Sequence, residues 1–289
     1  MIELPKPFIV GVSRSGTTLL RLMFDAHPDM TIPPETHFIR RLNLQCERKD
    51  FFSIVTSEVT WADFHIDKTD FKQALSRIKP FSVTEGLRCF YRLYAQKHGK
   101  KYVGDKTPVY SQSMITIQRM LPEARFIHLI RDGRDVALSQ KGLWFGPGDN
   151  IDAAAEFWVS RIQLAREQAP LLKYYMEVKF EELILDPTNI LINVCNFLEI
   201  PFSEQMLSYY INAKERLNEL EDHYHAGRSL LIKKEDLLSL FKLTEKSPDR
   251  NRVFCWKNQM PETDQISYEK IAGRLLADLG YETRFTEFL

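Results

Sequence analysis

The stretch from residue 8 to residue 26 constrains the fold more than any other part of the 289-residue sequence. Phe8-Ile9-Val10 is a short apolar run with a β-branched majority, which predicts a buried strand of a parallel sheet. Helix-forming residues from Leu19 to Ala26 predict a helix that ends near Pro28. Between them lies Gly11-Val12-Ser13-Arg14-Ser15-Gly16-Thr17-Thr18. A strand, a glycine-bearing loop and a helix predict an anion-binding loop, because loop amides and a helix N-terminus direct partial positive charge at one point.

The loop has the Gly-x4-Gly spacing of a P-loop, but Thr17 stands where an ATPase or GTPase has lysine. The nearest cation is Arg14, inside the loop, so a γ-phosphate would be poorly held. The variant resembles the 5′-phosphosulfate loop of sulfotransferases that use 3′-phosphoadenosine 5′-phosphosulfate (PAPS). This resemblance implies a donor site made of Arg14, Ser15, Gly16, Thr17 and Thr18. An ordinary glycine turn between strand and helix is the alternative.

A second motif begins at Ala124-Arg125-Phe126-Ile127-His128-Leu129-Ile130, which predicts a buried strand. Arg131 follows directly, and Ser139 stands eight positions later on the expected next helix. The pair resembles the 3′-phosphate motif of sulfotransferases, and a guanidinium and a hydroxyl are suitable donors to a phosphate. A Walker B strand would instead be followed by aspartate. The alternative is a helix capped by Asp132 or Asp135, with the arginines in salt bridges.

Glu35 follows two prolines after a short predicted strand at residues 29–32, so its carboxylate is expected to have a defined direction. A carboxylate at a strand end is a candidate general base. Capping of the next helix, or pairing with Arg40, is the alternative. The sequence around Glu35 is similar to that of tyrosylprotein and bacterial sulfotransferases, which implies the catalytic base. His37 is a second candidate, although a histidine on a helix face is the more ordinary interpretation.

Three further cations are candidate site residues. Lys106 ends a predicted strand in a Lys-Thr-Pro context that resembles the catalytic lysine of the tyrosylprotein branch. Arg252 and Lys257 lie in a segment that resembles the part of these enzymes that folds over the nucleotide, which implies phosphate contacts. We expect the neighbouring Trp256 to pack in the core.

Composition sets wider limits. Lys+Arg and Asp+Glu both number 39, so net charge does not support nucleic-acid or membrane-surface binding. The four cysteines form no CxxC pair, which indicates no zinc site and no disulfide framework. No secretory pattern and no membrane-length apolar run is present, so we expect a cytoplasmic protein without a membrane span. His223 and His225 are expected at the surface.

The sequence predicts one α/β domain over residues 1–289, with a central, mostly parallel five-stranded sheet and helices on both faces, in a P-loop-like three-layer fold. Residues 38–100 and 203–248 are expected to be helical insertions that shape the acceptor site. The aromatic residues of the first insertion are expected to form core. The charged second insertion is either a solvated helical face or a lid.

The predicted function is metal-free, in-line transfer of a sulfuryl group from PAPS to an acceptor hydroxyl, with release of 3′-phosphoadenosine 5′-phosphate (PAP). Glu35 is the expected base, and Arg14 and Lys106 are expected to neutralise charge on the leaving phosphate. A P-loop nucleotide kinase or ATPase, and a non-catalytic nucleotide-binding protein of the same fold, are the alternatives. The sequence does not choose among carbohydrate, lipid, small-molecule and peptide acceptors, and it leaves the oligomeric state open.

Overall fold

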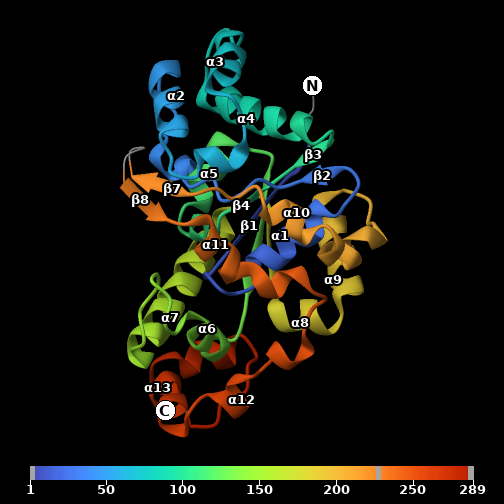
Figure 1. Cartoon of the computed structure of the whole chain (residues 1–289). Helices are drawn as coiled ribbons and strands as arrows, with labels where there is room; N and C mark the ends of the chain where they lie inside the picture. Colours follow the sequence, from blue (N-terminus) through green and yellow to red (C-terminus); the bar gives the residue numbers. More distant parts are fainter. Residues whose placement is uncertain (1–3, 226–228, 286–289) are drawn as a thin grey trace.

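A parallel four-stranded sheet lies at the centre of the computed structural model, which describes residues 4–225 and 229–285 (Figure 1). The strand order is β4-β1-β5-β6, and every neighbouring pair is parallel. The strands are β4 (Asp105–Lys106), β1 (Lys6–Gly11), β5 (Ala124–Ile130) and β6 (Tyr175–Lys179). The strands predicted around Phe8 and at residues 124–130 are therefore confirmed.

The fifth strand predicted for this sheet pairs elsewhere. β2 (Met30–Thr31) pairs in parallel with β3 (Tyr102–Val103), and Gly104 separates β3 from β4. A Cβ atom on Gly104 would lie 2.7 Å from the carbonyl oxygen of Pro7, so the chain passes very close to β1 here. This interruption splits one edge into two short ladders, and the central sheet has four strands rather than five.

Side chains alternate between the two faces of the sheet, as period-two burial requires. On β1, Ile9 packs with α1 (Thr17–Asp25), α8 (Phe180–Leu185) and α9 (Pro187–Leu198), whereas Phe8 packs on the opposite face. Helices cover both faces, so the predicted three-layer α/β arrangement is confirmed. The helices of the other layers and insertions are α2 (Arg48–Thr56), α3 (Lys68–Ser76), α4 (Val83–Lys97), α5 (Met114–Met120), α6 (Gly133–Gln140), α7 (Ile151–Gln168), α10 (Ala213–Leu217), α11 (Lys234–Phe241), α12 (Trp256–Gln259) and α13 (Glu262–Asp278).

The first insertion, residues 38–100, contains α2, α3 and α4 and projects from one end of the sheet (Figure 1). Its aromatic side chains are core, as expected. Phe51, Phe71 and Phe90 are fully buried. Phe90 meets Phe38 edge to face with ring centroids 5.1 Å apart.

The second insertion is not wholly helical, and the prediction for residues 203–248 is wrong in this respect. β7 (His223–His225) and β8 (Ser229–Ile232) form an antiparallel hairpin before α11. Three consecutive apolar residues in β8, Leu230 to Ile232, suit a strand better than one face of a helix. His223 is buried rather than exposed, because its Nε2 lies 2.9 Å from Oδ2 of Asp63 in the first insertion.

Buried ion pairs connect the C-terminal helix to the sheet layer. The guanidinium of Arg134 on α6 lies 2.7 Å from Asp132 and 2.6 Å from Glu269 on α13, and all three side chains are fully buried. Trp256 packs against the same guanidinium, whose central carbon lies 3.5 Å from the centroid of the Trp256 ring. Trp256 is fully buried, which confirms the prediction that it packs in the core.

Replacing Arg134 should therefore be costly. We expect Arg134→Leu to lower the free energy of unfolding by about 3–5 kcal/mol, since two buried carboxylates would lose their cation. Urea denaturation measures the change. The matched control is Arg166→Leu, whose pair with Glu177 at 2.7 Å is partly exposed and should contribute less than about 1 kcal/mol. Equal losses in the two variants would contradict this account.

Candidate functional site

The loop from residue 11 to residue 18 joins β1 to the N-terminus of α1 at the carboxyl edge of the sheet. Gly16 has φ +96°, and a Cβ there would lie 2.5 Å from the Phe180 ring, so only glycine fits. Arg14 also adopts a left-handed backbone conformation, with φ +74°. Thr17 and Thr18 form the first helical residues and line a cavity of about 1000 Å³. Ser15 is fully buried and is absent from the cavity lining.

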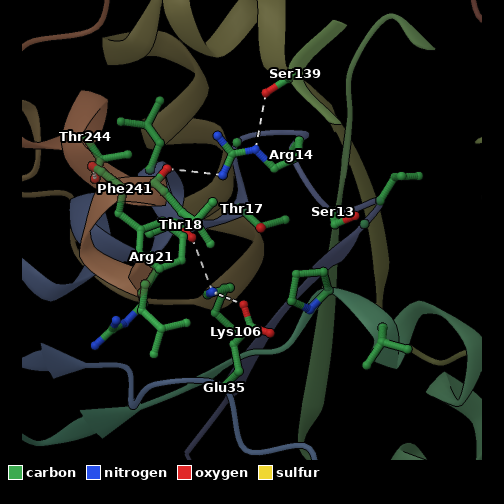
Figure 2. A pocket seen from close by; sticks show the side chains of 18 of the residues that line it. Ser13, Arg14, Thr17, Thr18, Arg21, Glu35, Lys106, Ser139, Phe241 and Thr244 are labelled. Atoms are coloured by element: carbon green, nitrogen blue, oxygen red, sulfur yellow. Dashed lines mark hydrogen bonds and ion pairs between the residues drawn. The ribbon is translucent and has the colours of Figure 1, made fainter. Parts of the chain in front are cut away.

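Arg14 extends across the mouth of this loop toward two other elements (Figure 2). Its Nε donates to Oγ of Ser139 at 3.2 Å, and its Nη1 donates to the carbonyl oxygen of Leu240 on α11 at 3.1 Å. Burial lowers the pKa of Arg14, and the guanidinium groups of Arg131 and Arg252 lower it further. Three cations face one space, and an anion bound there would relieve their mutual repulsion.

Arg131 stands at the end of β5, next to the loop. Its Nη1 donates to the carbonyl oxygen of Arg14 at 3.3 Å, and its Nη2 donates to that of Arg252 at 2.8 Å. The guanidinium lies 4.4 Å from the centroid of Phe180 and 3.5 Å from Asp135. Its Nε is buried and has no hydrogen-bond partner among the described residues. The structure thus brings Arg14, Arg131, Ser139 and Arg252 to one wall of the cavity.

Glu35 and Lys106 meet on the opposite side of the loop, and Figure 2 shows the ion pair below Thr18. Nζ of Lys106 lies 2.5 Å from Oε1 of Glu35 and 3.3 Å from the hydroxyl of Thr18. Nε2 of His37 lies 3.2 Å from the other carboxylate oxygen. Burial acts to raise the pKa of Glu35, but Lys106 and His37 outweigh it and hold this pKa well below its usual range. Burial also lowers the pKa of Lys106, and the Glu35 carboxylate opposes that shift.

A buried polar network anchors the Glu35 turn, and the sequence analysis missed it. Asp105 is fully buried and accepts hydrogen bonds from the hydroxyls of Thr36 and Tyr91, each at 2.8 Å. The hydroxyl of Tyr110 lies 2.7 Å from that of Thr36. The network ties residue 36 to β4, which carries Lys106, and so holds Glu35 beside the lysine. The polar residues at 105–107 were visible in the sequence, but Thr36 and Tyr91, which bind Asp105, are distant from it along the chain.

One predicted phosphate contact lies elsewhere. Lys257 is absent from the cavity lining and pairs with Glu282 at 2.5 Å in the C-terminal segment. Its position is set by α12, which packs away from the loop against α6 and α13 through Trp256. Arg252, five residues earlier, does line the cavity.

Comparison with known proteins agrees with this geometry. A model described as "Sulfotransferase family" matches residues 5–204, which is most of the chain. The chain belongs to the sulfotransferase family. The match includes the loop, Glu35, Lys106, Arg131 and Ser139, and it ends before α11 and the β7–β8 hairpin.

Curated relatives of this sulfotransferase include protein-tyrosine sulfotransferases. It is 29% identical over 219 residues to "Protein-tyrosine sulfotransferase A" of Caenorhabditis elegans, covering 71% of the chain and 52% of the relative. It is 27% identical over 215 residues to "Protein-tyrosine sulfotransferase 1" of Danio rerio, covering 72% of the chain and 56% of the relative. The chain therefore spans about half the length of these two relatives.

Solved structures share the fold of this sulfotransferase. The sulfotransferase domain from the curacin biosynthetic pathway has a TM-score of 0.61 at 21% identity, covering 98% of this chain and all of that one (100%). The corresponding domain of the Synechococcus PCC 7002 olefin synthase has a TM-score of 0.58 at 20% identity, covering 98% of both chains. Within residues 4–225 and 229–285, no helix has the length and apolar character of a membrane span.

The Glu35–Lys106 pair gives a stability prediction. We expect Glu35→Gln to lower the free energy of unfolding by about 2 kcal/mol at pH 7, because the buried ammonium loses its counter-charge. The folded-state pKa of Glu35 is depressed. The stabilisation by Glu35 is therefore present above the unfolded carboxyl pKa of about 4 and is lost as the pH falls through the folded value.

Urea denaturation at pH 7 and at pH 3.5 measures both effects, with Glu282→Gln as the control. The Lys257–Glu282 pair has the same 2.5 Å separation, but its side chains are 33% and 50% exposed, so its loss should cost less than about 1 kcal/mol. A Glu35→Gln variant as stable as the control variant at pH 7 would contradict the prediction.

Proposed function

We propose that this sulfotransferase transfers a sulfuryl group from PAPS to the hydroxyl of an acceptor. Family membership supports the reaction class. The observation that carries the choice of donor is that Arg131, which follows β5, and Ser139, on α6, lie beside Arg14 of the loop after β1 in one cavity. Two anion sites side by side suit a nucleotide with a phosphate group at each of two ribose positions.

The two ends of the donor would occupy different parts of this wall. Backbone amides of the 11–18 loop, with Arg14, Thr17 and Thr18, would bind the 5′-phosphosulfate. The guanidinium of Arg131, the Ser139 hydroxyl and Arg252, which all line the cavity, would bind the 3′-phosphate. Arg14 now donates to Ser139, and its guanidinium would turn toward the phosphosulfate when the 3′-phosphate takes that hydroxyl.

Transfer would proceed in line. The acceptor oxygen forms a bond to sulfur as its proton passes to Glu35, and the bond from sulfur to the phosphate oxygen breaks. Negative charge then grows on the leaving phosphate, near Lys106 and Arg14. A Lys106 ammonium drawn toward that oxygen would weaken its hold on Glu35 and make the carboxylate a stronger base at that moment. The fixed cations would supply the charge that metal ions supply in phosphoryl transfer, so we expect no metal requirement.

Both insertions would belong to the same domain as the donor site and would shape the acceptor site. Thr60 and Asp63 of the first insertion line the cavity. So do Leu237 and Phe241 of the second. The hydroxyl-bearing acceptor would enter between them and meet Glu35.

Calorimetric titration with PAP and with ADP, both in EDTA, tests the proposed donor. We expect PAP to bind without metal and ADP to bind at least tenfold more weakly, since ADP lacks the 3′-phosphate. Arg131→Ala should weaken PAP binding about 30-fold or more, because a buried charged hydrogen-bonding partner is lost.

The control is Lys257→Ala, which removes a cation that lies outside the cavity and should leave PAP affinity unchanged. Equal binding of PAP and ADP, or a magnesium requirement for binding, would overturn the proposal and favour a nucleotide kinase or ATPase.

A further inference from the structure

The turn that carries Glu35 is held at residue 32 by two side chains of α1. β2 ends at Thr31, and Ile32 is fully buried, so its backbone groups need partners other than a neighbouring strand. Oδ1 of Asp25 accepts a hydrogen bond from the Ile32 N–H at 2.7 Å, and Nε of Arg21 donates one to the Ile32 carbonyl oxygen at 3.0 Å. Both backbone groups of Ile32 therefore bind the same helix.

α1 is also the helix that begins in the 11–18 loop, so its side chains have a fixed position relative to the proposed donor site. Arg21 and Asp25 are four residues apart, which places them on one face of α1, and Nε of Arg21 lies 3.3 Å from Oδ2 of Asp25. Two prolines separate Ile32 from Glu35 and restrict the backbone between them. The position of Ile32 thus limits where the Glu35 carboxylate can lie.

Both insertions contact the same point. Nη2 of Arg216, on α10 of the second insertion, lies 3.4 Å from the Ile32 carbonyl oxygen and 3.2 Å from Oδ1 of Asp25. Its Nη1 donates to Oε1 of Glu219 at 2.7 Å, and Oε2 of Glu219 accepts from the hydroxyl of Tyr94 on α4 at 2.7 Å. A buried network of charged groups is seldom required for stability alone, because apolar side chains of similar volume often stabilise a core as well.

We propose that Arg21 and Asp25 are positioning residues for sulfuryl transfer, which hold Glu35 in register with the donor loop through the backbone of Ile32. The Asp105 network fixes the other end of this turn, at residue 36, against β4. The two attachments together would place Glu35 beside Lys106 and beside the loop. The catalytic consequence rests on the proposed function, because Glu35 would act as the base of that reaction.

A double-mutant cycle tests the placement of Glu35 and needs neither donor nor acceptor. The variants are Arg21→Met, Glu35→Gln and the double variant, compared by urea denaturation at pH 7. If Arg21 holds Glu35 beside Lys106, the destabilisation caused by Glu35→Gln should fall to less than half in the Arg21→Met background. Equal destabilisation in the two backgrounds, or none in wild-type protein, would overturn the inference. If Arg21→Met does not fold, Arg21→Lys replaces it, because lysine keeps the charge but lacks the planar fork.

Arg125 provides the matched control. It is also a buried arginine, its Nη1 donates to the carbonyl oxygen of Phe197, and its Nη2 lies 2.7 Å from Glu199. Its partners are thus of the same kinds as those of Arg21, but Arg125 is absent from the cavity lining. Arg125→Met should destabilise the protein without changing the effect of Glu35→Gln. Coupling as large as that of Arg21 would show general loosening of the fold and would overturn the assignment.

Hydrolysis of labelled PAPS gives the catalytic readout, because water then serves as the acceptor. Arg21→Met should lower kcat about tenfold, since a small displacement of a base is costly. Arg21 also lines the cavity, so calorimetric titration with PAP separates positioning from direct donor binding. We expect the PAP affinity of Arg21→Met to stay within twofold of wild type, and Arg125→Met to change neither quantity. Weaker PAP binding with an unchanged kcat would overturn the positioning role.

The two proposals can fail separately. If wild-type protein does not bind PAP, the proposed function fails, while the cycle still shows whether Arg21 places Glu35. If wild-type protein binds PAP but the cycle is additive, the positioning inference fails alone. Where water is too poor an acceptor for a measurable rate, the cycle decides the inference.

Discussion

Parallel pairing of β1 with β4 and with β5 is the constraint on which the site depends. In this register Ile9 pairs with Lys106, and Gly11 pairs with Leu129. Because parallel strands end at the same edge, the loop after β1, the lysine that ends β4 and the arginine after β5 must converge. A slip of one residue in either pairing would turn a site residue toward the opposite face of the sheet.

Charge on this edge is arranged in two sets with different partners. Arg14, Arg131 and Arg252 line one cavity, where Asp135 lies 3.5 Å from Arg131, and the repulsion of Arg14 by the other two cations favours an anionic ligand. Lys106 has Glu35, so its charge is balanced until a ligand competes for it. The Asp105 network keeps the Glu35–Lys106 pair beside Thr18, so that the proposed base lies next to the loop. In the proposed mechanism, donor binding and proton removal would both depend on one short segment, β4.

Local patterns in the sequence predicted the parts of this site that lie within a strand and the loop that follows it. The glycine-bearing loop after β1, Arg131 after β5 and the position of Lys106 at the end of β4 all belong to that group. The strand count was wrong because Gly104 interrupts an edge where the chain presses on Pro7. The hairpin was missed because charged residues on either side of β8 suggested a helix. The Asp105 network was not predictable from spacing, since Thr36 and Tyr91 reach it from distant segments.

A crystal structure with bound PAP would test the central claim most directly. The account predicts the 5′-phosphate at the 11–18 loop, near Lys106, and the 3′-phosphate on Arg131 and Ser139, with Arg14 turned away from the serine. The adenosine would then leave the cavity wall formed by Leu237 and Phe241 of α11 free for the acceptor. A nucleotide bound with its 3′-phosphate away from Arg131, or lying along the α11 wall, would contradict the account.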